Sequence, residues 1–244
     1  MEAILATFDQ LFKGRFLLFF IPGLVVATIY YGWRWKTQSE LDILNYEGDL
    51  PLIQWFSDVL TWVAGGIFTI LDTIFEQLYI FIVITLLSPF NTTLSEKLDF
   101  RLSGNQPETG WARRINEFIR MIFIAIIALF LELIFMLFYW LLTFLPFIGG
   151  DYDSIIYFVI KAFFFGFAFY DFSLERYQKN VFQSLGFAFS KPLGMLITGS
   201  IFLGIYHIPY AGISLAPVLT VMIATVVYLY YENYLPKSTQ DQKE

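Results

Sequence analysis

The stretch LLSPFNTTLSEKLDFRL, residues 86–102, follows a long apolar run that ends in IFIVITLL. Proline cannot continue the hydrogen bonding of a helix, and it disfavours helical geometry at the residue before it. Ser88-Pro89 is therefore predicted to end the apolar helix. Thr93 to Glu96 then fits the T-x-x-E capping box, in which a new helix starts.

A helix start at this place would favour an anion. Its exposed N–H groups and its dipole attract negative charge. The uncharged polar side chains around it are candidate substrate-binding residues, namely Ser88, Asn91, Thr92 and Thr93. A well-capped helix start beside a membrane, without a ligand, is the alternative interpretation.

Composition places this stretch in a membrane protein. Hydrophobic residues make up 57% of the chain and aromatic residues 20%, with a mean hydropathy of +0.63. A soluble domain would have to expose much of this surface. We therefore expect an all-α integral membrane protein with a single membrane domain over residues 1–244. Apolar segments that could approach or cross the roughly 30 Å hydrocarbon core are 16–33, 60–87, 121–148, 154–172, 193–209 and 214–232.

The basic residues predict how these segments are oriented. They concentrate in every second connection, whereas the GGDYD turn at residues 149–153 has no cation. By the positive-inside rule, both termini should be cytoplasmic, with residues 236–244 as a polar tail. Residues 1–15 are predicted to form an interfacial amphipathic helix that contacts membrane lipids. Its apolar positions, at helical spacing, are Ile4, Leu5, Phe8, Leu11 and Phe12.

Two parts of the chain do not fit simple crossings. An uninterrupted helix from Trp111 to Leu145 would be about 50 Å long at 1.5 Å per residue, so it should project into the cytoplasmic interface. Segments 193–209 and 214–232 instead contain repeated glycines and prolines, which favour short or broken helices. A re-entrant hairpin and two crossings are both compatible with the charge pattern.

Three stretches form a further pattern, beyond hydropathy. They are SPFNTTLSEKL after a long apolar helix, SLERYQKNVFQSLGFAFSKP, and IPYAGISLAPVLTVMIATVVY near the C-terminus. Together they resemble the CysZ-like sulfate permease family, which includes the etoposide-induced membrane proteins. The resemblance implies two long transmembrane helices plus partly penetrating helical hairpins, assembled into a homo-oligomer. It also implies a bacterial inner-membrane permease that takes up sulfate, or a related oxyanion, for cysteine biosynthesis.

The same family pattern draws attention to the cations before the first apolar segment. The family carries a glycine with adjacent basic residues there, and an anion contact is attributed to them. Lys13, Gly14 and Arg15 stand at this place and are candidate substrate-binding residues. Gly14 would let backbone N–H groups approach an oxyanion. The alternative is that the two cations only anchor the helix at the cytoplasmic surface.

Charged residues inside or beside the apolar segments give two further expectations. A charged side chain inside the membrane is energetically costly, so each such residue is a candidate for a functional role. These residues are expected either to form a proton-coupled path or to be buried in helix packing, for example as a pair between Glu132 and Lys161. The intramembrane ionisable residues are Asp72, Glu76, Glu132 and Lys161. At the cytoplasmic boundary, Arg113, Arg114 and Arg120 are expected to snorkel or to bind lipid phosphates.

Several classes of function find no support in the sequence. There is no cysteine and only one histidine, so thiolate and zinc sites are not expected. Neither a G-x-S-x-G motif nor a phosphate-binding P-loop is present. We expect no enzyme, no metal, no cofactor and no nucleic-acid partner. The leading function is an anion permease, and the alternative is a non-conducting membrane scaffold or interaction protein with the same fold.

Overall fold

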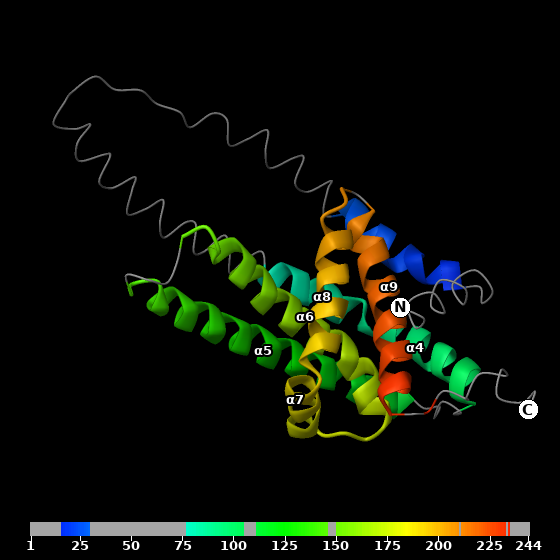
Figure 1. The fold of residues 1–244 in the computed structure, drawn as a ribbon. Helices are drawn as coiled ribbons and strands as arrows, with labels where there is room; N and C mark the ends of the chain where they lie inside the picture. Colours follow the sequence, from blue (N-terminus) through cyan, green and yellow to red (C-terminus); the bar gives the residue numbers. More distant parts are fainter. Residues whose placement is uncertain are drawn as a thin grey trace, which may run out of the picture.

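The computed structural model of the chain describes residues 16–29, 77–104, 111–145, 150–209, 211–232 and 234. Every regular element in these ranges is helical, which confirms the all-α prediction (Figure 1). In chain order the elements are η1 (Phe16–Phe19), the helix Phe20–Ile29, the helix Gln77–Leu86, α4 (Ser88–Ser103), α5 (Trp111–Leu142), α6 (Asp153–Arg176), α7 (Val181–Ser190), α8 (Pro192–Tyr206) and α9 (Gly212–Tyr231).

Three of these helices, α5, α6 and α9, are long and apolar enough to cross a membrane. The two long transmembrane helices that the resemblance implies are therefore an approximate count, since three helices of the described residues have this length. α9 is one uninterrupted helix of 20 residues with Pro217 inside it, so the expectation that segment 214–232 is short or broken is wrong. A single proline removes only one internal hydrogen bond, and packed neighbours offset such a loss in membrane helices.

Two helix pairs are bent sharply at breaks of at most four residues, so each pair is either a broken span or a re-entrant loop. The helix Gln77–Leu86 meets α4 at 58°, and α7 meets α8 at 93°. α8 has 15 residues, which corresponds to about 22 Å and is less than the thickness of the hydrocarbon core. The bend before α4 lies at the predicted break, Ser88-Pro89.

The capping box predicted from Thr93 to Glu96 is wrong. α4 begins five residues earlier, at Ser88, and its N-cap residue Leu87 makes no side-chain cap. Thr93 lies inside the helix, where its hydroxyl donates to the Pro89 carbonyl oxygen at 2.8 Å. The fixed φ of Pro89 suits the first turn of a helix, so the chain changes direction and resumes helical geometry at once.

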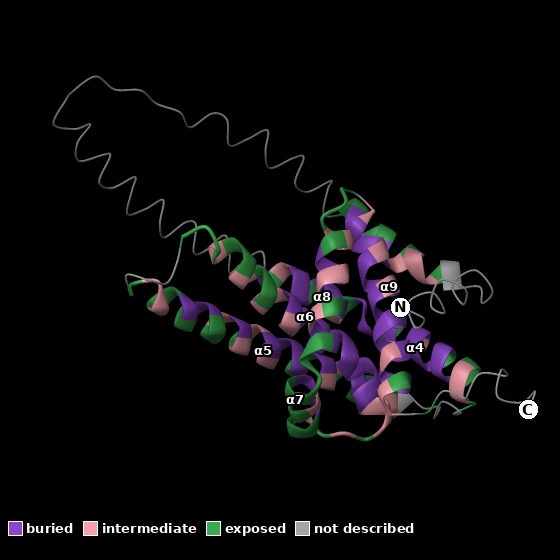
Figure 2. Cartoon of the chain, in the orientation of Figure 1, coloured by how far each residue is buried: buried purple, intermediate pink, exposed green. Residues whose placement is uncertain are grey.

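The helices differ greatly in how far they are buried. In α9, 83% of the apolar stretch is buried, whereas in α5 the share is 33% (Figure 2). α9 packs against α4, α6 and α8, while the main neighbour of α5 is α6. The core therefore surrounds α9, and α5 leaves an apolar face for lipid.

α6 and α8 form the most extensive helix contact, and small residues make it possible. A Cβ atom added at Gly199 would overlap the carbonyl oxygen of Ala162, and one added at Gly166 would overlap that of Met195. Such small residues let two membrane helices meet backbone to backbone. This contact fixes the position of α6, which carries four of the charged groups described next, namely Lys161, Asp171, Glu175 and Arg176.

Candidate functional site

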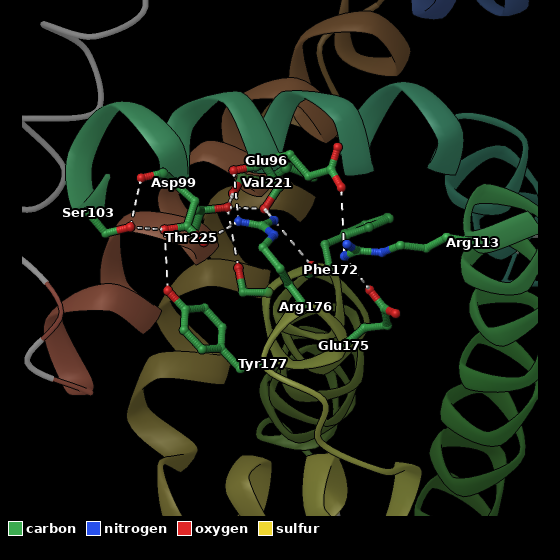
Figure 3. Close-up of polar contacts among 12 residues, drawn as sticks. Glu96, Asp99, Ser103, Arg113, Phe172, Glu175, Arg176, Tyr177, Val221 and Thr225 are labelled. Atoms are coloured by element: carbon green, nitrogen blue, oxygen red, sulfur yellow. Dashed lines mark hydrogen bonds and ion pairs between the residues drawn. The ribbon is translucent and has the colours of Figure 1, made fainter. Parts of the chain in front are cut away.

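The ends of α4, α5 and α6 bring together a set of buried charges (Figure 3). The most deeply buried pair joins Arg176 of α6 to Asp99 of α4, with 2.5 Å between Nη1 and Oδ2. Their side chains are 6% and 0% exposed. The guanidinium also donates from Nη1 to the Ser95 carbonyl oxygen (3.1 Å) and from Nη2 to the Ser95 hydroxyl (2.5 Å). A buried charge costs little only when it is paired and hydrogen-bonded in this way.

Hydroxyl groups extend this pair into the core. The Ser95 hydroxyl shares a 2.7 Å hydrogen bond with Thr225 of α9, and the Ser173 hydroxyl of α6 donates to the same Thr225 oxygen at 3.4 Å. Asp99 also accepts from the Ser103 hydroxyl (2.5 Å) and from the Tyr177 hydroxyl (3.3 Å). One continuous polar network therefore joins α4, α6 and α9 (Figure 3).

Arg120 joins α5 to α6. Its Nε and Nη2 donate to the two carboxylate oxygens of Asp171, at 3.0 and 2.7 Å. It also donates to the Lys179 carbonyl oxygen (2.6 Å) and to the Ser184 hydroxyl (3.1 Å). The expectation that Arg120 snorkels to lipid phosphates is therefore wrong. The sequence did indicate that Asp171 needs a cationic partner, because it is a lone acid in the apolar run FAFYDFSL.

Arg113 also points inward, against three carboxylates from three helices. Its nearest partner is Glu117 on the same helix at 2.6 Å, followed by Glu96 of α4 at 3.8 Å and Glu175 of α6 at 4.0 Å. Figure 3 shows Arg113 reaching between Glu96 and Glu175. Arg114, in contrast, is exposed and forms no ion pair with the described residues.

Three of the four predicted anion-binding residues of α4, namely Ser88, Thr92 and Thr93, line a small cavity between α4 and α5, and Asn91 does not. Ser88 and Asn91 are 1% and 2% exposed, and neither Ser88 Oγ nor Asn91 Nδ2 has a hydrogen-bond partner. The cavity has a volume of about 20 Å³, which is enough for one water molecule. Its lining residues are Ser88, Pro89, Thr92, Thr93, Glu96, Arg114, Glu117 and Phe118. Two carboxylates and one guanidinium thus share its wall.

The structure brings the intramembrane residues Glu132 and Lys161 together through a third side chain, Gln77. With its amide oriented to suit both neighbours, Gln77 donates from Nε2 to Glu132 Oε1 at 3.2 Å and accepts at Oε1 from Lys161 Nζ at 2.6 Å. Glu132 is fully buried, and its Oε2 has no hydrogen-bond partner. Sequence reasoning missed Gln77, because an uncharged amide in an apolar helix carries no charge signal.

The remaining predicted site residues lie outside the described part of the chain. These are Lys13, Gly14 and Arg15 before the first apolar segment, and Asp72 and Glu76 in the second. Among the residues that the structure describes, no group of histidine, aspartate or glutamate side chains could hold a metal ion.

Comparison with known proteins adds one finding. The model of a family described as "Sulfate transporter CysZ/Etoposide-induced protein 2.4" matches residues 3–223, nearly the whole chain. No curated protein matches the chain.

Proposed function

The chain belongs to the sulfate transporter CysZ/etoposide-induced protein 2.4 family, and from this premise we propose that it is an anion permease for sulfate or a related oxyanion. The family match over residues 3–223 is the observation that carries the proposal. The three helices long enough to span a membrane make it a multi-pass membrane protein. We place it, as part of the proposal, in a bacterial inner membrane, as a homo-oligomer with both termini cytoplasmic, supplying sulfate for cysteine biosynthesis.

Of the two predicted groups of substrate contacts, we assign the anion first to Lys13, Gly14 and Arg15. Two cations with a glycine between them offer positive charge and open backbone N–H groups to an oxyanion. The predicted residues on α4 contribute no cation, and in the lining of their cavity the two carboxylates of Glu96 and Glu117 outnumber the one guanidinium of Arg114. A bare sulfate there would meet like charge unless those carboxylates stay neutralised.

The intramembrane group Asp72, Glu76, Glu132 and Lys161 has two proposed roles, namely proton coupling and packing. The bridge through Gln77 supports packing for Glu132 and Lys161, because one amide satisfies both the carboxylate and the ammonium. The unpartnered Glu132 Oε2 supports proton coupling, because it is an acceptor with no assigned donor. Uptake that ignores an imposed proton gradient would exclude the coupling role.

Radiolabelled sulfate uptake into liposomes that carry the purified chain tests the proposal. We expect saturable uptake, inhibited by sulfite more than by chloride. Arg15→Ala should reduce uptake by about tenfold, as expected for the loss of one charge-assisted hydrogen bond. Arg101→Ala is the matched control, because Arg101 is an exposed cation on α4 outside the cavity. Absence of uptake by monodisperse protein, or an equal loss in the control, would contradict the proposal.

A non-conducting scaffold is the second candidate, and one observation favours it. Arg113, Arg120 and Arg176 are all engaged with carboxylates, which leaves none of these three guanidinium groups open to an anion. In a scaffold, such ion pairs would only hold the helices in register. Well-folded protein that shows no sulfate uptake would support this reading.

A further inference from the structure

The cavity between α4 and α5 has a charge pattern that suits a cation better than an anion. Glu96 and Glu117 stand on its wall, and both also face Arg113, at 3.8 and 2.6 Å. A third carboxylate, Glu175, lies 4.0 Å from the same guanidinium. Three carboxylates, Glu96, Glu117 and Glu175, thus stand against two guanidinium groups, those of Arg113 and Arg114, and the remaining negative charge attracts a cation.

The hydrogen-bonding groups of the cavity match a primary ammonium. Such a group carries three N–H donors and no acceptor. Glu96 and Glu117 offer carboxylate oxygens, and Ser88 offers a hydroxyl oxygen that is buried and has no partner in the protein. A volume of about 20 Å³ admits one water-sized group. An –NH₃⁺ group is of this size, whereas a trimethylammonium group is larger and has no donor.

The mouth of the cavity adds a site for phosphate. Arg114 lines the cavity, is exposed, and forms no ion pair with the described residues. Arginine binds phosphate through paired N–H groups. The neighbours of the lining residues in the chain are exposed and apolar, namely Phe90 beside Pro89, and Ile115 and Ile119 beside Arg114 and Phe118. A ligand held here therefore carries an ammonium, a phosphate and an apolar part.

We propose that this cavity binds the headgroup of a phosphatidylethanolamine-type lipid. Its ammonium sits between Glu96, Glu117 and the Ser88 hydroxyl, its phosphate contacts Arg114, and its acyl chains lie along the exposed apolar residues of α4 and α5. The α5 side of the cavity, from Arg114 to Phe118, belongs to the charged first turns of a helix that is otherwise mostly apolar, and we place these turns at the level of the lipid headgroups. The assignment is independent of whether the chain transports sulfate.

Lipid binding to the full chain in detergent tests this site, with native mass spectrometry and thermal melting as readouts. Phosphatidylethanolamine, phosphatidylcholine and phosphatidylglycerol with identical acyl chains are compared, together with soluble glycerophosphoethanolamine and sulfate. Phosphatidylethanolamine should bind about tenfold more tightly than phosphatidylcholine, since only its ammonium donates hydrogen bonds to the carboxylates. Equal binding of the three lipids would overturn the proposal. So would full competition by glycerophosphoethanolamine, which would assign a soluble ligand, or a sulfate-induced melting shift that Ser88→Ala abolishes, which would assign an anion to this cavity.

Two variants locate the site. Ser88→Ala should leave the melting temperature without lipid unchanged, because the hydroxyl has no partner in the protein, yet it should reduce the preference for phosphatidylethanolamine about threefold to tenfold. Arg114→Gln should weaken the binding of all three lipids, since each of them carries a phosphate. Ser190→Ala and Arg101→Gln are the matched controls, because both are exposed and lie outside the cavity. An unchanged lipid preference in Ser88→Ala would overturn the assignment.

Discussion

α6 is held on two sides by different physical means. Against α8, the backbones meet at Gly166 and Gly199, where no side chain fits between them. Against α5, aromatic pairs such as Phe135 with Phe164 are accompanied by polar pairs at both ends, Arg120 with Asp171 and Tyr139 with Asp153. The first contact depends on shape and tolerates no added atom. The second includes charge pairing and hydrogen bonding, so these polar parts can be removed one at a time.

The largest effect is expected from filling the backbone contact. Gly199→Val places two methyl groups against the Ala162 carbonyl and should destabilise the fold by about 3 kcal/mol, at the upper end of overpacking penalties. The measurement is the melting temperature of the purified chain in detergent, together with its elution profile. Gly204→Val is the control on the same helix, because a Cβ atom at Gly204 meets nothing within 4 Å. An equal fall in melting temperature in both variants would contradict the prediction, because it would show that the close backbone contact at Gly199 is not the cause of the destabilisation.

An intermediate effect is expected from breaking the ion pair between α5 and α6. Arg120→Met leaves Asp171 buried without its cation, and we expect a loss of about 2 kcal/mol, less than for a fully buried pair because Arg120 keeps some contact with solvent. The double variant Arg120→Met with Asp171→Leu removes both charges and should recover most of the stability. Arg101→Met, at an exposed cation, controls for the loss of charge alone. A double variant as unstable as Arg120→Met would contradict the ion-pair explanation.

The smallest effect is expected at the opposite end of the same helix pair. Tyr139→Phe removes the hydroxyl that donates to Asp153 at 2.5 Å but keeps the edge-to-face contact with Tyr157. The melting temperature should fall by less than in Arg120→Met, because a single hydrogen bond contributes less than a paired charge. Tyr152→Phe, at an exposed ring, provides the baseline. A drop as large as that of Arg120→Met would mean that both ends of the contact are equally important.

The helices themselves could be predicted from local sequence. The length of α5, the break at Ser88-Pro89 and the membrane class all follow from hydropathy and from the properties of proline, and the structure agrees. The start of α4 could not be placed in the same way, because two local signals compete there. The T-x-x-E pattern favours a start at Thr93, whereas Pro89 favours one at Ser88, and the proline prevails.

The buried charges were much harder to foresee. Arg176 and Asp99 are 77 residues apart, and Arg120 and Asp171 are 51 apart. Local periodicity shows which helix face is apolar, but it does not show which distant helix supplies a partner. For this reason Arg113 and Arg120 were expected to face lipid, although both point into the bundle. The contact of α6 with α8 was equally hidden, since a glycine in an apolar segment is as typical of a broken helix as of a close crossing.

The right-angled bend between α7 and α8 has a mechanical consequence. When α8 lies along the membrane normal, the 93° bend puts α7 flat in the membrane surface, with Phe182 and Phe189 exposed on it. α7 is also tied to α5, because Arg120 donates to the Ser184 hydroxyl. A displacement of α7 would therefore be passed to two helices at once, to α8 through the bend and to α5 through the Arg120 hydrogen bond.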